Sequence, residues 1–549
     1  MREDEGSVLP PRIPFWDRPA PRRAILAGAA AAAAAGTAAV VVAAARQGGS
    51  GDDRAGTAAV PEAPGPGAGA KATATADLPA KQIGDPRRQA AHLLRRAGFG
   101  GTPAEIDEFA KLSRKEAADR LLNFRAIDNS GLDTRIQAAG PGDLTTMKPV
   151  EANRWWITRM AFTARPLEER MTFIWHGLLT TQVSKIGGQH FKLMLIQNAL
   201  FRENALAKYD DLLKAVSKDP AMLFYLDTAE STKEHPNENY ARELMELFSM
   251  GVGNYTETDV RESARAFTGW RVTMPERPAE PKANLTEEER RRLLDAAFAA
   301  WEPKFYVQQR LHDSSAKTFL GKTGAWDGDD IVEIIMTQPA TGRYICTRLF
   351  MEFANYNPDP RTVDRLVKVW DSTGHQVRDV VREILISDEF YSEASYRGFV
   401  RGPIEFVAGA IRGLELDGAT IQASGAGGGP NARQADSFRG MDQVLFEPPS
   451  VAGWPGGETW LSSSTFFARM NYLDSFLFPR GRPIKIPVLA AAGSPEQMVD
   501  IALDRLVDGN VTDAGREAIY AYARGVKNVD ERAAGVAYLV LASPEYQLT

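Results

Sequence analysis

Helix-start signals recur at close intervals along this chain, and they restrict its fold more than any other feature. Thr102-Pro103-Ala104-Glu105, Ser113-Arg114-Lys115-Glu116 and Thr286-Glu287-Glu288-Glu289 each place a hydroxyl three residues before a glutamate, the spacing of a capping box. Amphipathic segments of helical period fill most of residues 86–542, whereas strand signals are limited to residues 270–273, 304–307 and 318–320. The pattern predicts a mostly α protein, a large multi-helix domain with a small β-hairpin insertion.

The first 82 residues differ in composition from the rest of the chain. Residues 1–23 form an extension that ends in the pair Arg22-Arg23, and residues 24–45 carry no charge. A run of this length can cross a bilayer as a helix, and a preceding arginine pair is typical of a twin-arginine export signal. We therefore expect an exported protein whose residues 24–45 are a signal, removed by cleavage, or a membrane anchor, kept with residues 1–23 in the cytoplasm. Residues 46–82 are rich in Gly, Ala, Pro and Thr, which predicts a disordered linker.

The residues after the linker are expected to form the folded body, with a helical core domain at residues 83–480 and a C-terminal helical lobe at residues 481–549 packed on it. Cys346 is the only cysteine, so no intramolecular disulfide can hold the exported chain together. The chain has 65 basic and 71 acidic residues and no basic stripe, which gives no reason to expect a nucleic-acid partner.

Residues 235–248 have the highest density of hydrogen-bonding groups. At helical spacing one face is apolar, and the other carries candidate ligand-binding residues, Asn237, Glu238, Asn239 and Arg242. Glu243 lies at the border between the faces, where burial would raise the pKa of a carboxyl group and suit it to acid–base catalysis. The alternative is a solvated face crossed by ion pairs four residues apart.

Histidines, carboxylates and tryptophans elsewhere supply further candidates. Neutral imidazoles and a carboxylate could bind a divalent metal, and the candidate ligands are His176, His235, Glu243 and His312. The candidate catalytic residues are Glu243, His312, Asp313 and Lys317. Trp175 and Trp454 are added to the candidate ligand-binding residues, because an aromatic ring can stack on a ligand. A structural role for each histidine and a packing role for Trp454 are the alternatives.

Several segments of the chain together resemble a bacterial family known only as domain of unknown function 1800. The resemblance rests on residues 91–100, Trp175-His176, residues 237–248, 255–257, 268–270, 312–321 and 446–455. It implies a largely helical, exported or envelope-associated protein, and it implies no established activity. Members of the family look as if they often work beside another exported family, similar in fold to alkaline phosphatases. Residues 281–301 would be an insertion specific to this chain.

Two functions remain open at this point. The first is an exported or membrane-anchored protein of the cell envelope that binds or scaffolds an exported partner protein or a surface polymer. The second is a metal-assisted or acid–base hydrolase whose polar pocket gathers His176, residues 237–243 and residues 312–317. The second function requires that side chains from these three segments meet in one recess.

The predicted export signal can be tested directly. A reporter fused after residue 82 should be translocated, and replacing Arg22 and Arg23 together by Lys should abolish its translocation, because the twin-arginine route reads the arginine pair. Fractionation of cells that carry the two fusions measures the outcome. Unchanged export of the Lys variant would rule out this route.

Overall fold

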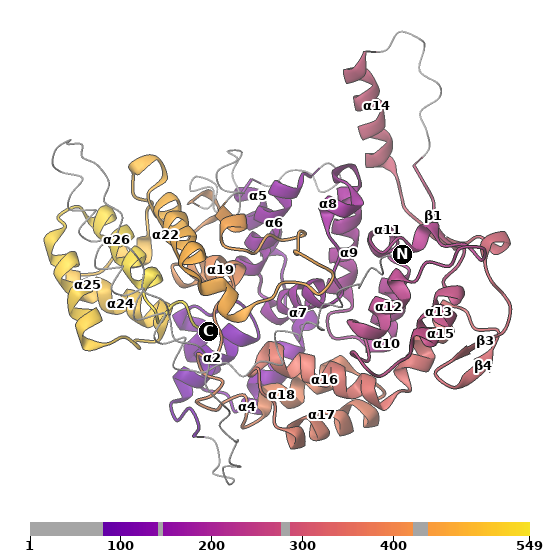
Figure 1. The fold of residues 1–549 in the computed structure, drawn as a ribbon. Coiled ribbons are helices and arrows are strands. Elements are labelled where there is room, and N and C mark those ends of the chain that lie inside the picture. The colour runs from indigo at the N-terminus through magenta and orange to yellow at the C-terminus, as the bar shows by residue number, and fades with distance from the viewer. Residues whose placement is uncertain (1–80, 141–146, 276–285, 421–436) are drawn as a thin grey trace, which may run out of the picture.

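The computed structural model describes residues 81–140, 147–275, 286–420 and 437–549 (Figure 1). The predicted extension at residues 1–23, the predicted signal or anchor at residues 24–45 and nearly all of the predicted linker lie outside the described residues. Within the described ranges the protein is mostly helical, which confirms the predicted fold class. These ranges contain no helix with the length and hydropathy needed to cross a membrane.

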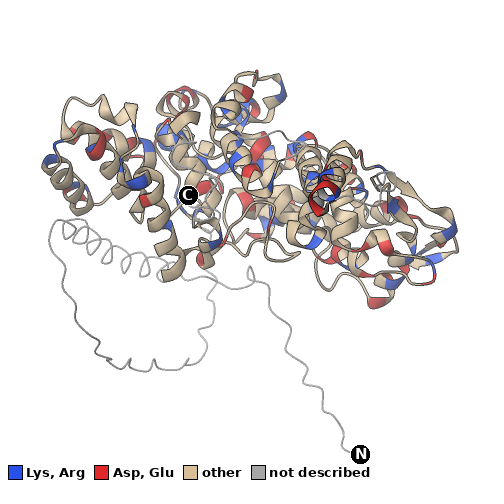
Figure 2. Cartoon of the chain, turned by 90° about the horizontal axis from the view of Figure 1, so that it is seen from above, with Lys and Arg blue, Asp and Glu red and all other residues tan. Residues whose placement is uncertain are grey.

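The helices form an elongated body with the C-terminal helices at one end and two small hairpins at the other (Figure 1). Those before the first strand are α2 (Pro86–Arg96), α3 (Pro103–Phe109), α4 (Arg114–Leu122), α5 (Gly131–Ala138), α6 (Pro149–Phe162), α7 (Pro166–Leu178), α8 (Val183–Ile186), α9 (Phe191–Glu203), α10 (Tyr209–Ser217), α11 (Pro220–Tyr225), α12 (Asn239–Glu246) and α13 (Glu257–Ala266). Those after it are α14 (Glu287–Ala300), α15 (Gly328–Met336), α16 (Pro339–Phe353), α17 (Pro360–Ser372), α18 (Val377–Ile386), α19 (Pro403–Gly413), α22 (Ser463–Leu477), α23 (Pro487–Ala490), α24 (Pro495–Val507), α25 (Asp513–Gly525) and α26 (Val529–Ala542). Lys and Arg alternate with Asp and Glu over the body (Figure 2).

The helix-start signals mark the N-termini of helices as predicted. Thr102, Ser113 and Thr286 are the N-caps of α3, α4 and α14, and each forms a reciprocal capping box with the glutamate three residues later. Such boxes satisfy backbone N–H groups that have no partner within the helix. These helix starts are therefore encoded by four consecutive residues.

The predicted strands form two separate two-stranded antiparallel hairpins. Strand β1 (Trp270–Val272) pairs with β2 (Phe305–Val307), and α14 lies in the connection between them. Strand β3 (Lys317–Phe319) pairs with β4 (Lys322–Gly324), a strand that the sequence did not predict. Leu320 and Gly321 both have positive φ, as a tight two-residue hairpin turn requires. Helix α13 packs on β3 and fixes the second hairpin to the body.

The C-terminal ends of several helices are capped by arginines from distant parts of the chain. The last carbonyl groups of a helix have no partner within it and carry partial negative charge, so a guanidinium group both bonds and neutralises them. Such contacts join Arg378 to Leu122 O of α4, Arg412 to Ala161 O of α6, Arg125 to Glu203 O of α9, Arg96 to Glu352 O and Phe353 O of α16, and Arg397 to Val507 O of α24.

A single cluster of buried apolar side chains extends from Ile83 to Tyr546. The predicted division at residue 480 stays a prediction. Helix α26 packs on α22, and α24 packs on α19, so the last helices contact the part of the chain that was assigned to the core.

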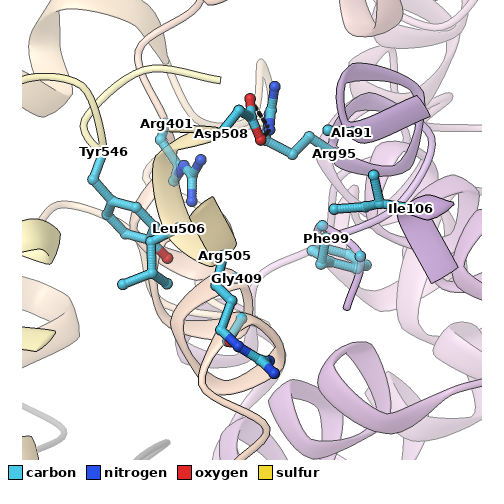
Figure 3. Close-up of a pocket in the computed structure, with 13 residues that line it drawn as sticks. Ala91, Arg95, Phe99, Ile106, Arg401, Gly409, Arg505, Leu506, Asp508 and Tyr546 are labelled. Carbon is cyan, nitrogen blue, oxygen red and sulfur yellow. Dashed lines mark hydrogen bonds and ion pairs between the residues drawn. The ribbon is translucent and has the colours of Figure 1, made fainter. Parts of the chain in front are cut away.

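Asp508, just after α24, joins the C-terminal helices to α2 (Figure 3). Its carboxylate accepts a hydrogen bond from Arg95 at 2.8 Å and others from Arg397 and Tyr396 at 3.2 and 3.0 Å. Although burial acts in the opposite direction, Arg95 and Arg397 hold the pKa of Asp508 well below its usual range. One buried carboxylate thus pairs with two nearly buried guanidinium groups.

Asp508→Asn is expected to lower the free energy of unfolding by about 3–5 kcal/mol, because it leaves two buried guanidinium groups without a carboxylate. Asparagine tolerates the positive φ of this position, so the backbone adds little to the effect. Urea unfolding followed by circular dichroism gives the value. The matched control is Asp500→Asn, whose partly exposed pair with Arg516 is worth less than about 1 kcal/mol. Equal losses in the two variants would contradict the account.

Candidate functional site

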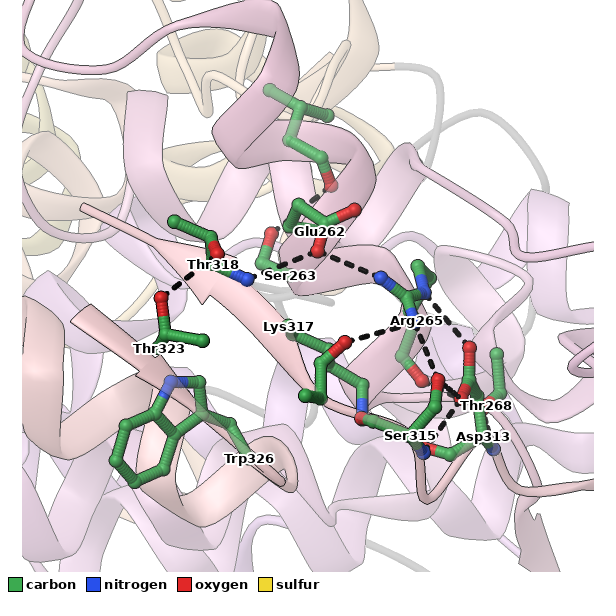
Figure 4. A network of polar contacts seen from close by, with 12 residues as sticks. Glu262, Ser263, Arg265, Thr268, Asp313, Ser315, Lys317, Thr318, Thr323 and Trp326 are labelled. Atoms are coloured by element: carbon green, nitrogen blue, oxygen red, sulfur yellow. Dashed lines mark hydrogen bonds and ion pairs between the residues drawn. The ribbon is translucent and has the colours of Figure 1, made fainter. Parts of the chain in front are cut away.

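The sequence-predicted residues Asp313 and Lys317 lie together beside α13 (Figure 4), and His312 is next to Asp313 in the chain. Arg265 Nε donates to Asp313 Oδ2 at 2.8 Å, and Lys317 Nζ donates to Asp313 O at 2.6 Å. His312 Nδ1 donates to Thr268 O at 2.8 Å. Although burial opposes the shift, hydrogen bonds from Arg265 and Ser315 keep the pKa of the Asp313 carboxyl well below its usual range, while burial lowers the pKa of Lys317.

The hydrogen bonds of this group are made within the loop and to α13. Lys317 Nζ is directed at two backbone carbonyls, those of Asp313 and Ser315, and its side chain is buried. Glu262 of α13 accepts hydrogen bonds from Arg265 and from Thr318 N, which joins the same network to β3. The geometry favours a role in holding the second hairpin on α13.

The polar face of α12 is a separate group at the surface. Asn237 Oδ1 accepts from Asn239 N at 2.9 Å, a turn that starts the helix. Arg242 pairs with Glu238 at 3.3 Å, as the ion-pair alternative predicts, and with Glu257 at 2.8 Å. These contacts match the solvated face that the sequence analysis gave as the alternative to a binding site. His235, just before this group, has an exposed side chain.

Glu243 lies half-buried on the same helix. Burial, with a contribution from Glu246 and against Arg242, raises the pKa of its carboxyl group to about 7. None of the described residues donates a hydrogen bond to this carboxylate. Burial and the charge of Glu243 raise the pKa of the neighbouring Tyr225 to about 12. Glu243 is therefore the acid–base candidate whose protonation is balanced near neutral pH.

Trp175 and His176 are buried in α7, in a third place. Trp175 Nε1 donates to Ala205 O at 3.1 Å, which uses its polar atom in packing. His176 Nε2 accepts a hydrogen bond from Phe446 N at 3.1 Å, and burial lowers the pKa of His176 to about 3. A neutral His176 thus holds Phe446, which has positive φ, at the start of the loop that leads to Trp454.

The predicted metal ligands His176, His235, Glu243 and His312 belong to these three different groups. Among the described residues, no group of three or more His, Cys, Asp or Glu side chains has the arrangement needed to hold a metal ion. The structure gives the predicted metal site no support, and the metal remains a prediction from sequence. The contacts of the three groups do not by themselves join them, and the shared recess that the hydrolase hypothesis requires stays a prediction.

Trp454 instead lines a cleft of about 790 Å³, counting the part that is open to solvent. The cleft lies where α2, α7, α16, α19 and residues 452–460 meet, and η6 (Gly457–Leu461), a 3₁₀ helix, closes that loop. Its lining residues are Arg96, Arg170, Phe173, Arg348, Met351, Glu352, Tyr356, Phe399, Val400, Glu405, Ala452, Trp454, Pro455, Gly456 and Trp460. We call this the Arg–Trp cleft.

Gly453 allows the loop of Trp454 to lie directly on α7. A Cβ atom on Gly453, which has φ of +80°, would lie 2.2 Å from Gly177 O, so only glycine permits this approach. Trp454 then stacks on Phe173 with ring centroids 5.8 Å apart and meets His176 edge-on at 5.3 Å. The indole is held in a fixed orientation at the wall of the cleft.

The Arg–Trp cleft has a positively charged floor. Arg96 and Arg170 are both nearly buried, and both donate to carbonyl groups at the end of α16. Arg170 also pairs with Glu405. Burial, with a contribution from Arg170, lowers the pKa of Arg96 to about 10, so the Arg96 guanidinium group keeps its charge at neutral pH.

Three N–H groups of cleft residues have no hydrogen-bond acceptor among the described residues, namely Trp454 Nε1, Trp460 Nε1 and Arg170 Nε. A buried donor left in this condition costs about 1–3 kcal/mol. All three are donors, and they are shielded from solvent by the surrounding side chains. The cleft therefore suits a ligand that brings acceptor oxygens and displaces these side chains slightly.

Residues 92–548 match the family model described as a protein of unknown function (DUF1800). The chain belongs to the DUF1800 family. This match confirms the resemblance drawn from sequence, and the family description assigns no activity. No curated protein and no solved structure matches the chain. The Arg–Trp cleft of this DUF1800 protein brings together two segments on which the resemblance rests, those around Arg96 and Trp454.

Of the residues that line the Arg–Trp cleft, Trp454 was predicted from sequence, whereas Arg96, Arg170, Trp460 and Glu405 were not. The sequence does contain a feature that indicates this loop. Two tryptophans, Trp454 and Trp460, stand on either side of the pair Gly456-Gly457. The two arginines carried no such signal, since each stands in an amphipathic helix where arginine is usually solvated. Their burial depends on partners that lie far away in the chain.

Burial of neutral His176 makes stability depend on pH. The unfolded chain binds a proton near pH 6.5, but the folded chain does so only near pH 3, so the free energy of unfolding falls as pH drops through this window. His176→Gln, which keeps an acceptor for Phe446 N, should reduce the loss between pH 7.5 and pH 5 by about 2 kcal/mol in urea unfolding. The control His235→Gln, at an exposed histidine, should leave the loss unchanged. If the free energy of unfolding of His176→Gln fell as much between pH 7.5 and pH 5 as that of the wild type, His176 would be protonated in the folded protein over this range.

Proposed function

We propose that this DUF1800 protein is an exported, non-catalytic binding protein of the cell envelope that holds a segment of a surface glycan in the Arg–Trp cleft. The observation that carries the proposal is the combination of fixed aromatic rings with N–H donors that no described residue supplies with an acceptor. Ligand sites combine apolar and aromatic walls with a few placed polar groups. Sugars fit this lining, because they present apolar ring faces and many acceptor oxygens.

Export would bring the cleft to such a polymer. Its support is the sequence pattern of residues 22–45, in which an arginine pair precedes a charge-free run. Retention of that run as an anchor would keep the protein at the membrane surface, and cleavage would release it. An exported partner protein in place of the glycan is the other occupant that the cleft could take.

Glu243 supports a second candidate function, acid–base hydrolysis. Its carboxyl group is half-buried, has a pKa of about 7 and has no hydrogen-bond donor among the described residues. Perturbed carboxyl groups of this kind occur at catalytic sites and also in structural clusters. The binding proposal is favoured because Glu243 does not line the Arg–Trp cleft.

The proposal predicts that the full-length chain, in a mild detergent, binds soluble tetrasaccharides in isothermal titration calorimetry. The probes are tetramers of glucose, N-acetylglucosamine and galacturonic acid. Trp454→Ala should weaken the binding of the best tetramer about tenfold or more, because it removes the central aromatic wall.

The matched control is Trp326→Ala, which removes a half-buried tryptophan beside the second hairpin, and it should change affinity less than about twofold. Absence of binding by every tetramer, or equal losses in the two variants, would contradict the proposal. Shortened tetramers after incubation with the wild-type chain but not with Glu243→Gln would favour the hydrolase instead.

A further inference from the structure

We infer that the Arg–Trp cleft contains an oxyanion subsite, formed by Arg170 with Arg96 beside it and the indole N–H groups of Trp454 and Trp460, that selects glycans bearing carboxylate or phosphate groups. The inference rests on the proposed function and names the chemistry of its ligand. The first support is an imbalance of charge in the wall of the cleft.

The imbalance comes from arginines that share too few carboxylates. Arg96 and Arg170 are both close enough to Glu405 for its charge to act on them, and only Arg170 bonds it. Behind them, Arg401 and Arg469 are also buried next to Glu405. Two carboxylates, that of Glu405 and that of Glu352, which also lines the cleft and acts on Arg96, are thus shared by four guanidinium groups. A further oxyanion in the cleft would reduce this excess in a setting where solvent screens little.

The second support is the kind of hydrogen-bonding atom that remains without a partner. Arg170 has 3% of its surface exposed, and its Nε has no acceptor among the described residues. Trp454 Nε1 and Trp460 Nε1 are in the same condition, and all three residues line one cleft. A neutral sugar hydroxyl could accept from one of them, but an oxyanion offers several lone pairs and can accept from more than one donor. Charged acceptors also form the shorter and stronger bonds.

A buried pair elsewhere in the protein provides a matched comparison. Arg170 pairs with Glu405 in the first turn of α19, and Arg412 pairs with Glu105 in the first turn of α3. Both arginines are nearly buried, with 3% and 6% of their surfaces exposed, and both also contact backbone carbonyls. Only Arg170 lines the Arg–Trp cleft. Replacing each by lysine keeps the charge but removes the planar fork of donors.

The test is calorimetric titration of the full-length chain at constant ionic strength with four probes. They are tetragalacturonate, its neutral methyl ester, a glycerol-phosphate tetramer and free galacturonate. The inference predicts that a charged tetramer binds about tenfold or more tightly than the methyl ester. Arg170→Lys should remove most of that preference, and Arg412→Lys should leave it unchanged. The preferred charged tetramer identifies carboxylate or phosphate as the source of the oxyanion.

Trp460→Phe keeps the ion pair of Arg170 intact and removes one indole N–H, so it tests the subsite even if Arg170→Lys fails to fold. It should weaken the charged tetramers and leave the methyl ester within about twofold. Equal affinity for charged and neutral tetramers would overturn the inference while the proposed function stands. Binding of free galacturonate through Arg170 without binding of any tetramer would overturn the proposed function while the subsite stands. No binding of any probe would overturn both.

Discussion

Capping of helix C-termini by distant arginines is the interaction on which the rest of the structure depends. No disulfide can join the helices, because Cys346 is the only cysteine. Instead, guanidinium groups reach the terminal carbonyls of α4, α6, α9, α16 and α24, where backbone partial charge is negative. Where the arginine is buried, as Arg96 and Arg412 are, the contact is stable only if hydrogen bonds replace the lost hydration. The helices are thereby fixed relative to one another by polar contacts as well as by the apolar core.

The same interaction explains why the fold could be predicted in part. The N-termini of α3, α4 and α14 are encoded within four residues, and they were predicted from sequence. The C-terminal caps join residues far apart, since Arg412 is 251 positions from Ala161 and Arg96 is 257 positions from Phe353. No local pattern distinguishes such an arginine from a solvated one. Strand β4 was missed for a related reason, because its three residues gain their conformation from pairing with β3.

The candidate site residues that are close together in sequence could be predicted, whereas those brought together from distant helices could not. Asp313 and Lys317 were selected because they are polar residues close together in sequence. In the structure Asp313 bonds Arg265 of α13, and Lys317 bonds a backbone carbonyl of its own loop. The Arg–Trp cleft could not be assembled from sequence, because its walls come from α2, α7, α16, α19 and residues 452–460. Trp454 was the one member selected, because an aromatic ring can stack on a ligand. Arg96 and Arg170, which cap the C-terminal end of α16, also give the cleft its positive charge. The fold and the candidate binding site therefore use the same two side chains.

The most direct measurement of this account is a crystal structure of the protein grown with a saturating concentration of tetragalacturonate. The account predicts electron density for the sugar in the Arg–Trp cleft, with a carboxylate oxygen about 3 Å from the Arg170 guanidinium group and a ring against Trp454. Density beside Glu243 on α12, or a cleft without sugar while the tetramer is bound elsewhere, would contradict it.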